Sequence, residues 1–477
     1  MFCVKVSLSS TAKYSTQAAE AIKDLNPNAA DLLITSVLTS MVTDLGVIAP
    51  TSSGLLTFYD GKLNKSHTID GYFVSPKEFN GNDHEEHRIV MTYGGYVETC
   101  KGANTFAIPG IYKILDFLFK NFSSLPLKNL FEFPIKIAKN GFKLTQPSKD
   151  YFAHSLQPLF MWHDYSKEVL KGICEDLENG IVKLEKLSDT LNHMSNEGFN
   201  DFYIGDVSKE ILKTIKNEGG HATYEDFSNY ELIEDSKFNI NFKNLKLTGH
   251  AGPSIGGIMV LKYLEKLSIS KDINQLSEVY KFRKNNYEIF GNRKKYIKQE
   301  IVELSKSSST IQINTSDEMN NHFSITFSSG YGSGVLCSNT GMYFNNSLGE
   351  IELNPQGFLG DTKGDRLISN MSPLIIESSL GITTMGSPGA DRISSALAQV
   401  LINYSNTNDW KKSIDMPRFH VNIDGSTRAE PGSIKEGDGI TITDDYDMYF
   451  GGVCVSGINK EVFSFGDIRR GNTSWKN

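Results

Sequence analysis

Four hydroxyl side chains stand side by side in the segment "SKSSSTIQIN". They are Ser307, Ser308, Ser309 and Thr310, and apolar and polar residues alternate after them, which is typical of a β-strand. A hydroxyl on the first residue of a chain can act as a nucleophile, because the free α-amine beside it serves as the base. The run therefore predicts either a nucleophile exposed by cleavage of the chain or a flexible linker in an uncut chain.

Motifs for other chemistries are incomplete. His84 and His87 in "DHEEH" lack the partner residues of a zinc-binding helix. "GPSIGG" has no following Lys-Ser/Thr, and "GYGSG" has no strand-to-helix context, so neither predicts a nucleotide site. The five cysteines form no CxxC pair. We therefore expect no metal and no cofactor.

Composition limits the class of protein. The chain has 477 residues, of which 39% are hydrophobic and 22% charged, the balance of a soluble globular protein. Its net charge of −8 gives no basic surface for nucleic acid. Asp31 and Asp44 interrupt the longest apolar stretch, and the N-terminus lacks the pattern of a signal peptide. We expect a cytoplasmic protein that binds neither membrane nor nucleic acid.

The two parts of the chain on either side of the hydroxyl run differ in pattern. Residues before it show mainly helical periodicity, whereas those after it are strand-rich, with one clear helix at "DRISSALAQVLINYSN". The strand-rich part also contains a series of glycine- and serine-rich turns, each beside a strand: "GYGSGV", "NNSLGE", "LISNMSP" and "MGSPGADR". The boundary divides the chain into 1–307 and 308–477.

These turns, in this order, resemble those of the γ-glutamyltranspeptidases, which are N-terminal-nucleophile hydrolases. Further matching segments are "NPNAADLLITSVLTSMVTDLGVIAPTSSG", "NTFAIPGIYKIL", "HAGPSIGGI" and "MPRFH", so the resemblance covers nearly the whole chain. It implies an α/β (α+β) fold, the four-layer αββα sandwich. Residues 1–307 would be the large-subunit-like region and 308–477 the small-subunit-like region of one unit.

The resemblance also implies a reaction. In the family the precursor cleaves itself once, and the new N-terminal threonine attacks an amide such as that of glutathione. Matching the histidine of the family's Thr-Thr-His-x-Ser site to "NNHFS" would put Asn320 at the nucleophile, and an amide cannot serve. A gap-free match aligns "SSTIQIN" with the first strand and "HFSITFSS" with the second. This register favours Ser308, with Ser309 or Thr310 after a small slip.

Other catalytic positions carry over from the family motifs. The oxyanion hole would be formed by the backbone N–H groups of Gly389 and Ala390, since alanine keeps its N–H. Thr326 matches the threonine that steadies the surroundings of the nucleophile. The predicted catalytic residues are therefore Ser308, Thr326, Gly389 and Ala390.

The substrate-binding positions are altered. The family's arginine, which holds the α-carboxylate of the γ-glutamyl group, corresponds to Tyr72, and its two serines correspond to Ser369 and Asn370. A phenol cannot replace a bidentate guanidinium. The groups that accept hydrogen bonds from the substrate amine correspond to Ser328, Ser347 and Glu350, of which only Glu350 keeps a negative charge.

These changes predict an amide hydrolase or acyltransferase with altered or lost γ-glutamyl specificity. The alternative is an uncleaved, inactive relative that binds a small amino or amide compound. In either case the expected partner is a small-molecule amide or γ-glutamyl-like compound. A homodimer is compatible with the sequence, which does not fix the oligomeric state.

Overall fold

The structure is a computed structural model of the chain. It describes residues 4–78, 87–92, 97–252, 254–269, 278–279, 310–350, 363–422, 425–435 and 437–477.

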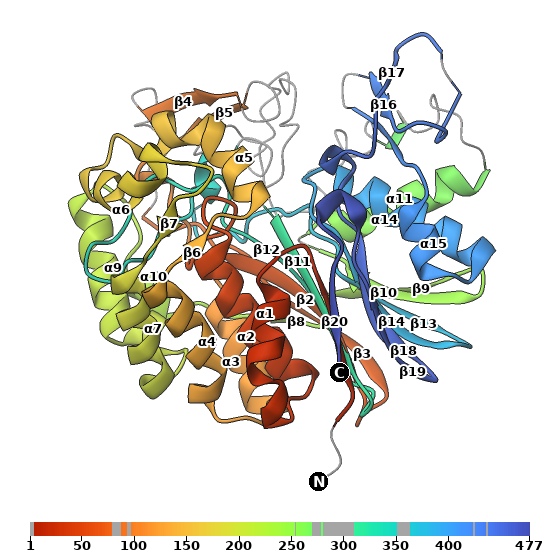
Figure 1. Ribbon diagram of the computed structural model, residues 1–477, viewed down its shortest axis with the longest axis horizontal. Coiled ribbons are helices and arrows are strands. Elements are labelled where there is room, and N and C mark those ends of the chain that lie inside the picture. The colour runs from red at the N-terminus through yellow and green to blue at the C-terminus, as the bar shows by residue number, and fades with distance from the viewer. Residues whose placement is uncertain are drawn as a thin grey trace.

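Two antiparallel sheets lie face to face in the middle of the molecule (Figure 1). The first has seven strands, in the order β20 (Thr473–Lys476), β1 (Val6–Ser10), β11 (Thr310–Asp317), β12 (His322–Ser328), β2 (Ser53–Asp60), β3 (Lys65–Gly71) and β8 (Ile233–Glu234). The second has six, in the order β19 (Glu461–Phe465), β18 (Cys454–Asn459), β14 (Gly381–Gly386), β13 (Leu374–Ser378), β10 (Leu245–His250) and β9 (Lys237–Phe242).

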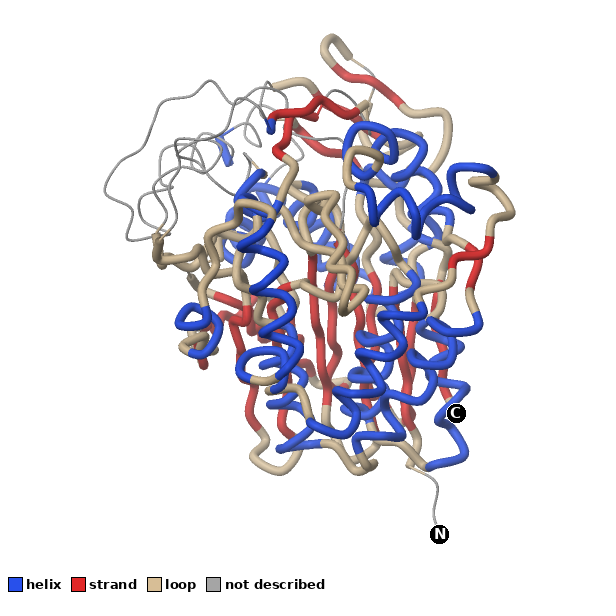
Figure 2. Tube along the Cα trace, turned by 90° about the vertical axis from the view of Figure 1, so that its left-hand side faces the viewer, coloured by secondary structure: helices blue, strands red, loops and turns tan. Residues whose placement is uncertain are grey.

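Helices cover the outer face of each sheet and complete the four layers (Figures 1 and 2). Those over the first sheet are α1 (Ser15–Ile22), α2 (Ala29–Thr43), α3 (Ile111–Phe122) and α4 (Leu127–Asn140). Those over the second are α11 (Gly256–Ile269), α14 (Arg392–Thr407) and α15 (Trp410–Asp415). This arrangement confirms the predicted sandwich.

Further short elements lie outside the two large sheets. The helices are α5 (Gln146–Ser155), α6 (Asp164–Glu175), α7 (Glu185–Glu197), α8 (Asp201–Ile204), α9 (Asp206–Asn217) and α10 (Tyr224–Ser228). The small sheets pair β4 (Arg88–Met91) with β5 (Val97–Cys100), β6 (Phe142–Lys143) with β7 (Ile181–Val182), and β15 (Phe419–Val421) with β16 (Thr427–Ala429) and β17 (Ile440–Ile442).

Helix α2 shows how the sequence forms the helical layer over the first sheet. Its N-terminus has a capping box, in which Asn28 and Asp31 each accept a backbone N–H from the other. Every residue of the helix is buried, because its apolar side chains and small hydroxyl residues pack against β11 on one side and α4 on the other. Asp31 is also buried, and it accepts hydrogen bonds from Ser123 and Ser124.

The hairpin of β11 and β12 contains the pair of strands that the gap-free reading expects. Thr310 pairs with Ser328, and the pairing continues without a break to Ser316 and His322. Asn320 lies in the turn with a φ of 65°, a conformation that asparagine tolerates better than most residues. Asn320 is therefore a residue of the hairpin turn, and the position of the nucleophile remains a prediction.

Both regions of the chain contribute strands to both sheets. Residues 1–307 supply β1, β2, β3 and β8 to the first sheet and β9 and β10 to the second. Residues 308–477 supply the remaining strands of each. The division at 307/308 remains a prediction, but the strands of the two regions interleave within one core. Within the described residues, every helix is too short or too polar to cross a bilayer.

Candidate active site

Strand register places Gln312 opposite Thr326. The two residues are cross-strand partners of β11 and β12, and both side chains are fully buried. The hydroxyl of Thr326 donates a hydrogen bond to Gln312 Oε1. Gln312 Nε2 in turn lies 3.0 Å from both Asn314 Oδ1 and Ser324 Oγ. The threonine that we predicted to steady the nucleophile therefore holds a carboxamide in this structure.

Gly386, at the end of β14, lies directly against this carboxamide. A Cβ atom at Gly386 would lie 2.1 Å from Gln312 Cδ, far inside van der Waals contact. Only glycine fits here while Gln312 keeps its place. The contact brings the turn that begins at Gly386 to the end of β11, although the two segments are distant in sequence.

The same turn contains the predicted oxyanion hole. Gly389 has a φ of 136° and Ala390 a φ of 50°, so their backbone amides adopt an unusual, non-helical arrangement just before α14. Among the described residues, neither N–H donates a hydrogen bond. Two such amides next to the positive end of a helix dipole are suited to an oxyanion.

Ser387 connects this turn to the C-terminal part of the chain. Its hydroxyl donates to Pro388 O at 2.7 Å and accepts the N–H of Gly452 at 3.0 Å. Gly451 packs so closely that a Cβ atom there would lie 2.7 Å from Ser387 Oγ. The position of the turn therefore depends on residues 451–452.

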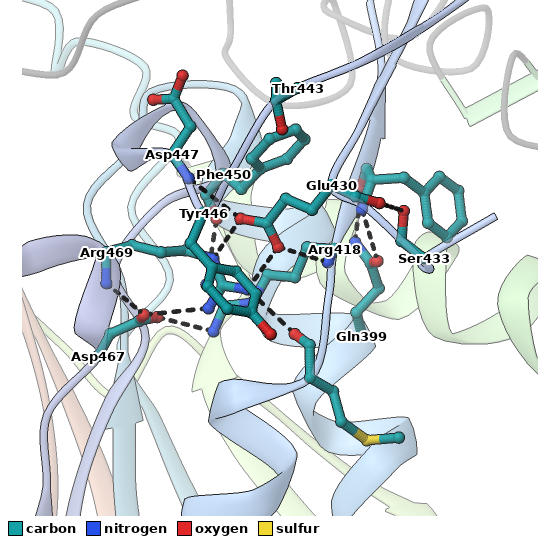
Figure 3. Close-up of polar contacts among 12 residues, drawn as sticks. Gln399, Arg418, Glu430, Ser433, Thr443, Tyr446, Asp447, Phe450, Asp467 and Arg469 are labelled. Carbon is teal, nitrogen blue, oxygen red and sulfur yellow. Dashed lines mark hydrogen bonds and ion pairs between the residues drawn. The ribbon is translucent and has the colours of Figure 1, made fainter.

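A buried network of charges fixes that segment (Figure 3). Arg418 pairs with Asp467 at 2.7 Å and donates to Phe450 O at 3.2 Å, and Asp467 accepts the N–H of Val453 at 2.8 Å. Arg469 also pairs with Asp467, at 3.1 Å, and with Glu430, and these four charged side chains are almost inaccessible to solvent. Buried charges need such pairing, because an unpaired one is strongly destabilising.

The predicted substrate positions lie around an apolar cluster. Tyr72 is 2% exposed and belongs to a small buried group, together with Leu55, Phe73, Ala107, Leu348, Leu367 and Met371. Leu348 follows Ser347 in the sequence, and Met371 follows Asn370. The structure therefore brings Tyr72 next to the two segments that carry Ser347, Ser369 and Asn370.

Glu350 and Ser328 meet at Gly330. The N–H of Gly330 donates to Ser328 Oγ at 3.1 Å, and a Cβ atom at Gly330 would lie 2.0 Å from Glu350 Oε1. Gly330 has a φ of 68°, so both its conformation and the space around it favour glycine. Glu350 is 5% exposed, so this carboxyl group belongs to the interior at the end of β12.

The segment of Ser369 and Asn370 lies on the N-terminus of α11. Ser369 O accepts hydrogen bonds from Ser254 Oγ and from the N–H of Ile255, both at 2.9 Å. A Cβ atom at Gly256 would lie 2.1 Å from Asn370 O. Backbone contacts therefore fix this segment.

Sequence reasoning missed Arg366. Its guanidinium donates to Tyr72 O, Tyr230 Oη and Glu231 O, and its Nε lies 3.8 Å from an oxygen of Asp70. The guanidinium therefore contacts the Tyr72 backbone, and these contacts occupy most of its donors. No motif pointed to it, since its partners lie in two other segments, 70–72 and 230–231.

The structure describes only Thr310 of the hydroxyl run at 307–310. Ser308 and Ser309 lie outside the described residues, while Thr310 begins β11 and is 8% exposed. The roles of Ser308, Thr326, Gly389 and Ala390 remain predictions. Within the described part of the chain, no group of His, Cys, Asp and Glu residues could hold a metal ion.

The layer order, the central hairpin and the adjoining turn define an N-terminal-nucleophile hydrolase fold. The solved structure of cephalosporin acylase from Bacillus halodurans has this fold and superimposes with a TM-score of 0.75. The match covers 100% of this chain and 96% of the acylase at 16% sequence identity, which supports the fold alone.

Within that class, the chain belongs to the γ-glutamyltranspeptidase family. The family model Gamma-glutamyltranspeptidase matches residues 15–289 and 268–438. A similar relative is the glutathione hydrolase proenzyme of Bacillus subtilis (strain 168), 21% identical over 470 residues, covering 86% of this chain and 79% of the relative. Another is glutathione hydrolase 3 of Arabidopsis thaliana, 23% identical over 473 residues, covering 85% and 72%.

Proposed function

We propose that this chain hydrolyses an amide or transfers its acyl group, with a hydroxyl of residues 308–310 as the nucleophile. Family membership supports the reaction class. The observation that supports the proposal at this site is the pair of N–H groups at Gly389 and Ala390, which donate no hydrogen bond within the described residues. They follow closely in sequence after Gly386, which packs against Gln312 of β11, and two such donors could stabilise an acyl oxygen.

The chemistry follows from these groups. The nucleophilic hydroxyl oxygen attacks the amide carbon while the α-amine of the same residue takes its proton. The carbonyl electrons move to the oxygen, which accepts hydrogen bonds from Gly389 and Ala390 N–H. Collapse of this intermediate breaks the C–N bond, and the leaving amine takes the proton from the α-amine. Water or an acceptor amine then cleaves the resulting ester.

Thr310 is the described hydroxyl of the run, and it is two residues from Gln312. Two residues of extended strand span about 7 Å, so Thr310 begins the strand within about 7 Å of Gln312, against which Gly386 packs. We keep Ser308 as the first candidate, with Ser309 and Thr310 as the alternatives that mutagenesis must separate.

The acyl pocket favours a substrate with an amine and without an α-carboxylate. The Tyr72 ring lies in an apolar cluster, where a carboxylate would lose its hydration without gaining a cation. Glu350 remains close to Ser328 and can accept hydrogen bonds from an ammonium group. A 4-aminobutyryl group has the amine and lacks the α-carboxylate, since it is a γ-glutamyl group from which that carboxylate has been removed.

The matched test compares 4-aminobutyryl p-nitroanilide with γ-glutamyl p-nitroanilide. We expect faster chromophore release from the 4-aminobutyryl compound, by about tenfold or more in kcat/KM, because a site without a charge partner rejects a carboxylate. Ser308→Ala serves as the nucleophile control. Preference for the γ-glutamyl compound would contradict the pocket assignment, and a wild-type protein that stays uncut and inert on both would contradict the proposed activity.

A further inference from the structure

A cavity of about 500 Å³ lies on the β1 side of the central hairpin. It is bounded by the end of β1, the start of α5 and the segment 448–473. Thr11 in its wall donates its N–H to Gln312 O and accepts the N–H of Gln312 on its hydroxyl, each at 3.0 Å. The cavity therefore adjoins the strand of the candidate active site, and Tyr72 is not part of its lining.

Two cations face this cavity. Lys13 is exposed, and its ammonium makes no hydrogen bond or ion pair with any residue that the structure describes. Arg470 packs its stem on Gly452, where a Cβ atom would lie 2.2 Å from Arg470 Cγ, and its Nη2 donates to Met448 O at 3.4 Å. Lys149, the third basic residue outside the buried network, pairs with Glu178 at 2.7 Å.

The ion network explains why Arg470 differs from its neighbour. Arg469 lines the same cavity but directs its guanidinium to Glu430 and Asp467 (Figure 3). Because these bonds fix residue 469, the following residue is presented from a rigid segment. The position of the Arg470 backbone is therefore set before any ligand binds, which lowers the entropic cost of binding.

Two carboxyl groups, those of Asp44 and Asp150, also line the cavity. Asp150 accepts a hydrogen bond from Gln146 Nε2 at 2.7 Å. Asp44 is 1% exposed, and burial raises its pKa to about 7 although Thr43 and Thr145 donate hydrogen bonds to it. Asp44 is thus mostly neutral below pH 7, and a neutral carboxyl group can donate its O–H.

The rest of the lining is apolar or carries hydroxyl groups. Leu144, Pro147 and Met448 supply apolar surface, and Thr11, Thr145 and Thr473 supply hydroxyls. The volume falls in the range of small-molecule sites and is much larger than an inorganic anion requires. This lining fits an organic acid better than a bare ion.

We propose that the cavity binds a small organic acid, with its carboxylate on the side of Lys13 and Arg470 and its apolar stem against Leu144, Pro147 and Met448. The site does not depend on the proposed hydrolysis. Binding should therefore persist in Ser308→Ala, which separates failure of this inference from failure of the proposed function.

Ligand-observed NMR titration tests the inference, with hexanoate as the probe and hexanamide as its neutral match. We expect hexanoate to bind about tenfold more tightly, and Lys13→Met and Arg470→Met each to weaken it about fivefold or more. Lys412→Met, which removes an exposed lysine on α15 away from the cavity lining, should leave the affinity unchanged.

Lys13→Met is the safer variant, because its exposed side chain has no described partner to lose. Equal affinity for hexanoate and hexanamide would overturn the inference, as would unchanged binding in both cation variants. Displacement of hexanoate by an equal concentration of inorganic phosphate would identify a bare anion site instead.

Discussion

The hydroxyl of Thr326 donates its hydrogen bond to the carboxamide of Gln312, its partner across the central hairpin. This contact lies within the first sheet, where β11 approaches Gly386 of the second sheet. Gln312 Nε2 donates to Asn314 and Ser324, so the carboxamide is part of a fully buried polar network. Such networks stabilise a fold only when every member is satisfied.

Removing this carboxamide should destabilise the protein. We expect Gln312→Ala to lower the free energy of unfolding by about 2–4 kcal/mol, because it leaves a cavity and removes the acceptor of the buried Thr326 hydroxyl. Urea denaturation followed by circular dichroism measures the change. Gln146→Ala, at an exposed glutamine, is the control and should cost less than about 1 kcal/mol.

Gly386→Ala should be destabilising for a different reason, and the two changes should be coupled. The new methyl group would lie 2.1 Å from Gln312 Cδ, so the single variant forces the strands apart. In Gly386→Ala/Gln312→Ala the methyl group has room, and we expect the double variant to be more stable than the sum of the single effects predicts. Strict additivity in the double-mutant cycle would contradict this packing.

Cleavage of the chain can be assigned by intact mass spectrometry. If Ser308 is the nucleophile, the purified protein should consist of two fragments, 1–307 and 308–477, and Ser308→Ala should remain a single chain. Ser309→Ala and Thr310→Val should still be cut. A cut that shifts to another bond, or that stops only in the Thr310→Val variant, would move the assignment along the run.

Restoring the family's charge at residue 72 should raise γ-glutamyl activity. The variant Tyr72→Arg/Asn370→Ser should increase the rate with γ-glutamyl anilide relative to 4-aminobutyryl anilide, because a guanidinium can hold the α-carboxylate. The structure adds a cost, since Tyr72 lies among apolar side chains and a buried charge lowers stability. We therefore expect a lower melting temperature together with a changed ratio of rates. Tyr72→Met is the matched control, with no gain in the ratio.

Asp44 should make stability depend on pH. Its pKa is about 7 in the folded state and 3.8 for an unperturbed group, so the folded chain retains a proton that the unfolded chain releases. Stability from this residue is therefore present in full below about pH 4 and is lost as pH rises towards 7. In Asp44→Asn the melting temperature should fall less than in the wild type between pH 4 and 7. Parallel profiles would show that Asp44 is ionised throughout.

The family resemblance was sufficient to predict the layers, and the alternation of apolar and polar residues was sufficient to predict the hairpin. The sequence did not predict which residue of β11 faces Thr326. That register depends on the turn, where Asp317 accepts the N–H of Asn321 at 3.0 Å and Asn320 adopts a positive φ. Turn geometry of this kind sets strand pairing but leaves no distinct trace in hydrophobic periodicity.

The charged residues show the same limit. Arg418, Glu430, Asp467 and Arg469 are separated by up to about fifty residues and carry no short motif that identifies them as a buried network. Arg366 is similar, since its partners lie in other segments. Pairing between distant charges requires the three-dimensional structure, because solvated surface charges have the same local sequence pattern.

The edge of the first sheet brings the two ends of the chain together. Strand β20 pairs with β1, and the N–H of Val6 donates to Asn477 Oδ1 at 2.8 Å. A short peptide could therefore join the ends, and the chain could be reopened before Ser308 as a circular permutant. Such a protein would begin with the hydroxyl residue and carry its free amine directly. Catalytic competence could then be measured without any self-cleavage step.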